Sequence, residues 1–135
     1  MLKMSKFWIL NGIKLVVGVI FLQTLFFKFS AAEESVFIFS KLGVEPWGRI
    51  GSGLIEFFII VLFFNPRFVW IGALVGIGAM FIALASHVFI IGIEVAKDHG
   101  LLFILALINF IGCCILLYAD KESFLLNLKK VLNRL

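Results

Sequence analysis

The chain has 135 residues, of which 63% are hydrophobic and 15% are charged. A soluble domain averages roughly half apolar and a quarter charged residues, so this chain carries more apolar surface than a water-exposed fold could bury. The net charge of +4 does not indicate nucleic-acid binding, because the basic residues are scattered and mostly flank apolar runs. We therefore expect one membrane-embedded domain, over residues 1–135, whose main partner is the lipid bilayer.

Four apolar runs are long enough to cross a bilayer as helices, and they occupy residues 8–29, 48–64, 68–91 and 100–118. Boundary and turn residues separate the runs, namely Glu33-Glu34, Glu45-Pro46, Asn65-Pro66-Arg67 and residues 94–100. Strands are excluded, because the runs do not alternate and open sheet edges are not tolerated in lipid. The predicted fold is an all-α, four-transmembrane-helix bundle with a short amphipathic C-terminal helix.

The first run has an alternative interpretation as a cleaved signal peptide. Residues 30–32 are Ser-Ala-Ala, which suits a cleavage site, and lysines precede the run. However, Lys28 interrupts the segment just before that position, and the apolar stretch begins as early as Phe7. We interpret the run as a retained helix.

Lysine and arginine residues near the ends of the runs predict the orientation. They lie on one side of a four-span chain, and they are Lys3, Lys6, Arg67, Lys121, Lys129, Lys130 and Arg134. The two loops on the other side are acidic, so both termini are predicted to be cytoplasmic. Residues 120–135 predict an amphipathic helix that either lies along the inner leaflet, extends the fourth helix or contacts a partner.

Polar side chains inside the runs require an explanation, since inserting a charged side chain at mid-membrane costs on the order of 2 to 3 kcal/mol of free energy on insertion scales. A rise of about 1.5 Å per residue puts six of them in the outer half of the bundle. We take these as candidates for a ligand-binding pocket, with Trp47 as a possible cap: Gln23, Lys28, Arg49, Glu56, His87 and Asn109.

A stripe of small residues follows one face of the third predicted helix. Gly72, Gly76, Ala79 and Ala83 share this face with His87. Such stripes let membrane helices approach closely, so we assign the four small residues to helix packing. His87 is then expected to point into the bundle.

Each polar candidate also has a purely structural interpretation. Glu56 is either a buried carboxyl, protonated or paired with Lys28, Arg49 or His87 to close the fold, or a ligand anchor or proton-exchanging group. Lys28 and Arg49 can be boundary anchors that reach the headgroups, and His87 can be a packing imidazole. Asn109 is expected to form an interhelical hydrogen bond.

Cys113 and Cys114 are adjacent within an apolar run, and we interpret them as packing thiols. The sequence has no phosphate-binding loop, nucleophile elbow, H-E-x-x-H or other metal-ligand spacing. We therefore predict no metal site and assign no catalytic residue. Ligation of haem by His87 and His99 has no supporting pattern.

Three segments carry a resemblance to a known family: residues 22–29 (LQTLFFKF), 42–49 (LGVEPWGR) and 53–56 (GLIE). With Lys28, Pro46, Glu56 and His87 at the corresponding positions, the chain resembles DoxX-like proteins over all four runs. The resemblance implies a four-helix protein of the bacterial inner membrane. Some relatives are associated with quinone-linked sulfur oxidation or with membrane complexes that handle oxidative stress, and the family motif implies no catalytic residue.

Three functions follow as hypotheses. The first is a membrane subunit or anchor of a redox system that binds a lipid-soluble ligand such as a quinone and meets a redox partner protein; if it is an enzyme, it is a quinone-linked oxidoreductase subunit. The second is a small transporter or proton pathway lined by the same polar residues. The third is a structural protein whose small-residue stripe drives homo-oligomer formation or grips a partner helix.

Overall fold

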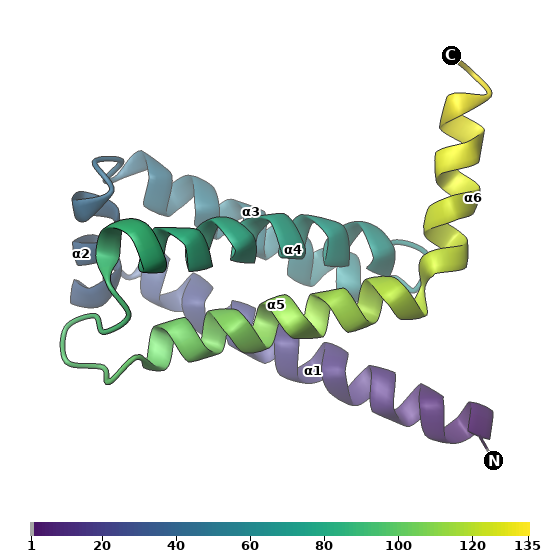
Figure 1. Cartoon of the computed structure of the whole chain (residues 1–135), viewed down its shortest axis with the longest axis horizontal. Helices are drawn as coiled ribbons and strands as arrows, with labels where there is room; N and C mark the ends of the chain where they lie inside the picture. Colours follow the sequence, from purple (N-terminus) through teal and green to yellow (C-terminus); the bar gives the residue numbers. More distant parts are fainter. Residues whose placement is uncertain (1) are drawn as a thin grey trace.

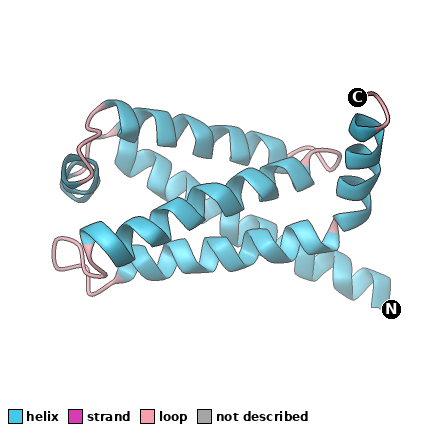
Figure 2. Ribbon diagram, turned by 45° about the horizontal axis from the view of Figure 1, so that its top comes forward, coloured by secondary structure: helices cyan, strands magenta, loops and turns pink. Residues whose placement is uncertain are grey.

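The computed structural model describes residues 2–135, except for the side chains of Leu2 and Ser123. All regular elements in this part of the chain are helices (Figure 2). They are α1 (Leu2–Phe29), α2 (Glu33–Lys41), α3 (Trp47–Phe63), α4 (Val69–Ser86), the π-helical turn η1 (His87–Ile91), α5 (Leu101–Ala119) and α6 (Lys121–Leu132). The predicted all-α fold is confirmed.

Helices α1, α3, α4 and α5 form an antiparallel bundle (Figure 1). Around the bundle α1 packs on α3, α3 on α4, α4 on α5 and α5 back on α1. Helix α2 lies across one end, beside the loop that joins η1 to α5, whereas the start of α1 and helix α6 lie at the other end. Both ends of the described chain are thus at the same end of the bundle.

Three stretches are long and apolar enough to cross a membrane, namely Lys3–Phe29, Val69–Ile91 and Leu101–Ala119. They match the first, third and fourth predicted spans. The second predicted span, residues 48–64, corresponds to α3, which has only 17 residues. At 1.5 Å per residue α3 is about 25 Å long, less than the roughly 30 Å of a bilayer core. A four-span count therefore remains a prediction.

The sequence predicted the turn between α3 and α4 but not helix α2, which lies between α1 and α3 in the chain. The turn at Asn65-Pro66-Arg67 is present as predicted, with the Arg67 backbone N–H donating to Asn65 Oδ1 at 3.0 Å. Helix α2 was not predicted. Its first turn carries two glutamates and its last turn Lys41, which suits the helix dipole, and its buried Ser35 faces the bundle.

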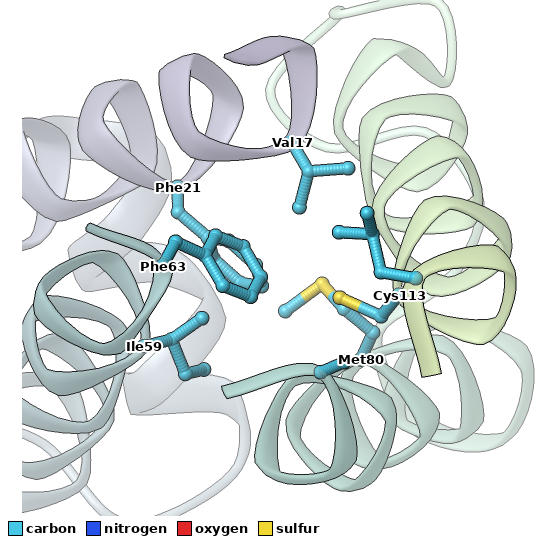
Figure 3. Close-up of a cluster of buried hydrophobic side chains, with 8 residues drawn as sticks. Val17, Phe21, Ile59, Phe63, Met80 and Cys113 are labelled. Atoms are coloured by element: carbon cyan, nitrogen blue, oxygen red, sulfur yellow. The ribbon is translucent and has the colours of Figure 1, made fainter. Parts of the chain in front are cut away.

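The half of the bundle away from α2 is filled by apolar side chains (Figure 3). The buried cluster comprises Val17, Phe21, Ile59, Phe63, Ala73, Met80, Cys113 and Leu116. Gly72 lies against Phe63, and Gly76 lies against Cys113 and Phe21. Ala79 and Ala83 continue this face and pack against the same cluster. The small residues of α4 thus contact neighbouring helices of the same chain.

Helix α6 turns away from α5 and runs across the direction of the bundle (Figure 1). The ring of Phe124 packs on that of Trp70, near the start of α4, with a centroid distance of 5.7 Å. The other apolar side chains of α6, among them Leu125, Leu128 and Val131, are exposed. The predicted C-terminal helix is present, and its position on the inner leaflet remains a prediction.

Substituting Gly72 tests the close packing of α4. A methyl group there would lie 2.9 Å from the Phe63 ring and 3.2 Å from Leu62 Cβ, whereas one at Gly78, on the same helix, meets nothing within 4 Å. We expect Gly72→Ala to reduce stability by about 1–3 kcal/mol through overpacking, and Gly78→Ala to leave it unchanged or higher. Thermal unfolding in detergent, followed by circular dichroism, measures both. Equal midpoints for the two variants would contradict this packing.

Candidate functional site

The half of the bundle nearest α2 contains a partly open cavity of about 360 Å³. Its walls come from the second half of α1, the first halves of α3 and α5, the end of α4 with η1, and one face of α2. Most of this lining is apolar. Lys28, Glu56, His87 and Asn109 line it as the sequence predicted, and Gln23 does so with a largely exposed side chain.

An ion pair between α1 and α3 is the strongest polar contact in the cavity. Lys28 Nζ lies 2.5 Å from Glu56 Oε1, and Thr24 Oγ1 donates to Glu56 Oε2 at 3.0 Å. Thr24 and Lys28 are four residues apart, so they share one face of α1. Only 2% of the Glu56 side chain is exposed. Of the three partners considered for Glu56, the structure shows Lys28.

Arg49 and Trp47 do not line the cavity. The Arg49 guanidinium is bound by Glu45, with Nε 2.8 Å from Oε1, and also donates to the backbone carbonyl of Lys28. That carbonyl belongs to the last turn of α1, where a cation is favourable. Trp47 is 79% exposed. Both were expected in the pocket; instead Arg49 is buried against Glu45 and the end of α1, and the Trp47 side chain is exposed.

His87 is buried where α4 changes into a π-helical turn. Its Nδ1 is 2.9 Å from the carbonyl oxygen of Gly92, and its ring meets the edge of Phe103. A carbonyl can only accept, so His87 Nδ1 carries a proton and donates it to Gly92. The sequence predicted that His87 points into the bundle, which is confirmed, but it did not predict the π-turn.

Two buried polar atoms of the cavity wall have no hydrogen-bond partner within the described chain: Asn109 Oδ1 and Ser35 Oγ. Asn109 is 1% exposed and Ser35 is 6% exposed. The interhelical hydrogen bond expected for Asn109 is therefore not formed by its oxygen. Buried polar groups are nearly always hydrogen-bonded, so such atoms indicate a missing partner.

Asp98 is a further polar residue of the lining, and the sequence analysis missed it. Its carboxylate accepts backbone N–H groups from Val95, Gly100 and Leu102 at 2.8, 2.9 and 2.9 Å, which caps the start of α5. Burial raises the pKa of Asp98, but these bonds and the nearby His87 outweigh it, so the pKa lies below its ordinary value. An Asp two residues before a Gly and an apolar run is a signal that could have identified this cap.

The remaining candidates for chemistry are accounted for by packing. Cys113 is buried beside Gly76, Cys114 is half-buried, and both thiols are free. Within residues 2–135 no group of three or more His, Cys, Asp or Glu side chains is arranged to hold a metal ion. The site is thus an apolar chamber with a few convergent polar groups, a combination suited to binding an apolar small molecule.

The Lys28–Glu56 pair can be tested by a double-mutant cycle. Removing one partner of a buried pair leaves an uncompensated charge, so we expect Lys28→Met to cost about 3–5 kcal/mol. Changing both residues to Met should recover most of that loss. Thermal midpoints in detergent give the comparison, with Lys6→Met, an exposed change on the same helix, as the control. A single variant as stable as this control would refute the pairing.

Asp98 predicts a pH dependence of stability. Because its pKa is lowered in the folded protein, the ionised carboxylate contributes stability that is fully present above the unfolded value of about 3.9. This contribution is lost as the pH falls through the folded pKa. We expect the midpoint difference between wild type and Asp98→Asn to be greatest at neutral pH and to shrink below about pH 4. Glu94→Gln, in the same loop, is the control; a difference independent of pH would contradict the assignment.

The site unites residues from six helical elements and from the loops after α2 and before α5, and most of them lie far apart in the sequence. Its polar groups divide into a charge-paired set on α1 and α3 and a set with unfilled hydrogen-bonding capacity on α2 and α5.

Compared with protein-family models, curated proteins and solved structures, the chain shows no match.

Proposed function

We propose that the protein binds a lipid-soluble small molecule of the quinone class in the cavity between its helices, as a membrane subunit or anchor of a redox system. The observation that carries this proposal is a largely apolar cavity of about 360 Å³ whose lining includes a few polar residues, among them Asn109 and Ser35. Small-molecule sites are typically about 300–1,000 Å³, mostly apolar, and carry a few placed polar groups. The cavity has each of these properties.

Size and chemistry both suit a ring-shaped headgroup. A cavity of roughly 150 Å³ already admits benzene, so the space here accommodates a substituted ring and the start of an apolar tail. Apolar side chains such as Ile20, Phe27, Met80 and Leu105 would contact the ring or tail. The side-chain amide of Asn109, through its N–H groups, would donate to one of its oxygens. Such a ligand reaches the site from the bilayer, where it dissolves.

The proposal includes four spans and cytoplasmic termini in the inner membrane. Helix α3 packs between α1 and α4 as an antiparallel neighbour of both, which supports a crossing in common with them. Lysine and arginine residues gather at the bundle end that holds the start of α1 and α6, and cytoplasmic ends of spans are enriched in these residues. Membership of the DoxX-like family remains part of the proposal.

A transport or proton pathway is less well supported. The polar groups stop at the packed half, where Phe21, Phe63, Met80 and Cys113 occupy the centre of the bundle (Figure 3). The described residues of that cluster are apolar or thiol side chains. A substrate crossing the membrane would have to displace them, whereas a ligand bound from the outer half would not.

Filling the cavity tests the proposal. Ala83 lines the cavity, and Ala85 lies about 200° around the same helix. We expect wild type and Ala85→Phe, purified in native nanodiscs, to retain one defined apolar molecule or to be stabilised by added ubiquinone or ubiquinol. Ala83→Phe should lose both properties, because its ring occupies the ligand space. Native mass spectrometry with lipid extraction and thermal unfolding provide the measurements.

Two results would reject ligand binding. One is a wild-type protein that retains no defined molecule and is stabilised by neither form of the added compound. The other is equal retention by Ala83→Phe and Ala85→Phe while both remain folded. Either would shift the assignment to a structural role for the bundle.

A further inference from the structure

Helix α6 and the residues after it have an apolar side and a basic side. At about 100° per residue, most of the apolar side chains fall within a sector of roughly 120°. They are Phe124, Leu125, Leu128, Val131, Leu132 and Leu135. Lys129, Lys130 and Arg134 lie outside this sector. Leu126 is an apolar residue that also lies outside it. Helices with this pattern typically lie in the interface between a membrane and water.

The first turn of α6 fixes which side of the helix faces the membrane. Phe124 is half-buried, and the centroid of its ring lies 5.7 Å from that of Trp70. Trp70 is the second residue of the apolar stretch Val69–Ile91, so it marks a membrane boundary. Leu128 and Val131 follow Phe124 by four and seven residues and share its side of the helix. The apolar side of α6 therefore faces the level of the spans.

Beyond Phe124 the described chain leaves this apolar side largely uncovered. Helix α6 runs across the direction of the bundle in both views (Figure 1, Figure 2). The exposed fraction is 42% for Leu128, 56% for Val131 and 59% for Leu132. In a membrane, headgroups and the adjoining parts of the acyl chains fill the space beside the spans at this level. Lipid is thus the neighbour that the position of α6 provides for these side chains.

Positive charge gathers at the end of the bundle that holds α6. The basic residues there are Lys3, Lys6, Arg67, Lys121, Lys129, Lys130 and Arg134. The nearby acidic residues along the chain are Asp120 and Glu122. Long Lys and Arg side chains can reach the phosphate level while the body of a helix lies deeper. Clusters of this kind are attracted to membrane surfaces that carry anionic lipids.

From these observations we infer that α6 lies on the membrane surface and binds anionic phospholipid headgroups. Its apolar side contacts acyl chains, and Lys129 and Lys130 contact phosphate groups. A membrane surface meets both sides of the helix at once, whereas a soluble acidic partner would leave the apolar side in water. Helix α6 is not a continuous extension of α5, because α5 ends at Ala119 and α6 turns away from it. The inference does not depend on the ligand of the cavity, which lies in the half of the bundle nearest α2.

Spin labels on the two sides of α6 test its position. Leu128→Cys and Lys130→Cys, each combined with Cys114→Ala, place the labels about 200° apart around the helix. Cys113 is fully buried, and protein without an introduced cysteine gives the background labelling. In nanodiscs of phosphatidylcholine and phosphatidylglycerol, we expect oxygen, which concentrates in lipid, to relax mainly the Leu128 label. A water-soluble nickel chelate should relax mainly the Lys130 label. A label at Glu94, in the exposed loop before α5, gives the reference for water.

Lipid titrations test the headgroup preference. Native mass spectrometry of the full chain in detergent gives its affinity for phosphatidylglycerol and for phosphatidylcholine with the same acyl chains. A Lys or Arg near an anionic surface strengthens binding by about fivefold. We therefore expect Lys130→Gln to weaken phosphatidylglycerol binding by about that factor and to leave phosphatidylcholine binding unchanged. Lys97→Gln is the matched control, because Lys97 is an exposed lysine between Glu94 and Asp98 at the other end of the bundle.

One pattern of results supports the inference, and three others overturn it. The supporting pattern is opposite accessibility of the two labels, with phosphatidylglycerol binding weakened by Lys130→Gln and not by Lys97→Gln. If both labels behave like the Glu94 label, α6 lies in water. If both are shielded from oxygen and from the chelate, a second copy or another protein covers the helix. Equal affinity for the two lipids overturns the anionic headgroup, whatever the labels show.

Discussion

The ion pair between Lys28 and Glu56 is the constraint around which this bundle is arranged. A carboxylate with 2% exposure in the middle of an apolar helix is acceptable only where a cation and hydrogen-bond donors meet it. Thr24 and Lys28 fulfil this need from one face of α1, which sets the rotation and height of α1 against α3. Arg49 adds a second link between α3 and the last turn of α1, because it donates to the Lys28 carbonyl.

Given this link, the bundle divides into two halves of different character. Beyond Glu56, side chains such as Ile59 and Phe63 pack with Phe21 and Met80, and glycines on α4 let the helices close in (Figure 3). On the other side, small residues such as Ala83 and Ala106 leave space that no side chain fills. A packed half holds the helices in position, so the hollow half can retain unsatisfied polar atoms without collapsing.

Composition and hydropathy were sufficient to predict the helical fold, because long apolar runs have no other stable form in lipid. The sequence also identified Lys28, Glu56, His87 and Asn109, since polar residues inside apolar runs are few. It could not distinguish Arg49, which lies on the same face of α3 as Glu56, because the partner that holds Arg49 away from the cavity is a backbone carbonyl of another helix. Ser35 and helix α2 were missed because a nine-residue helix offers too few turns for its periodicity to stand out.

The short length of α3 has a consequence for the membrane itself. With 17 residues against 28 in α1, α3 as a span would be shorter than the hydrocarbon layer it crosses. A bilayer adapts to such a mismatch by local thinning, at a fraction of a kcal/mol per Å. The bilayer would then be deformed unequally around the bundle, most of all beside α3, and the amount would depend on lipid composition. Bilayer thickness would then bear directly on the helix that carries Glu56.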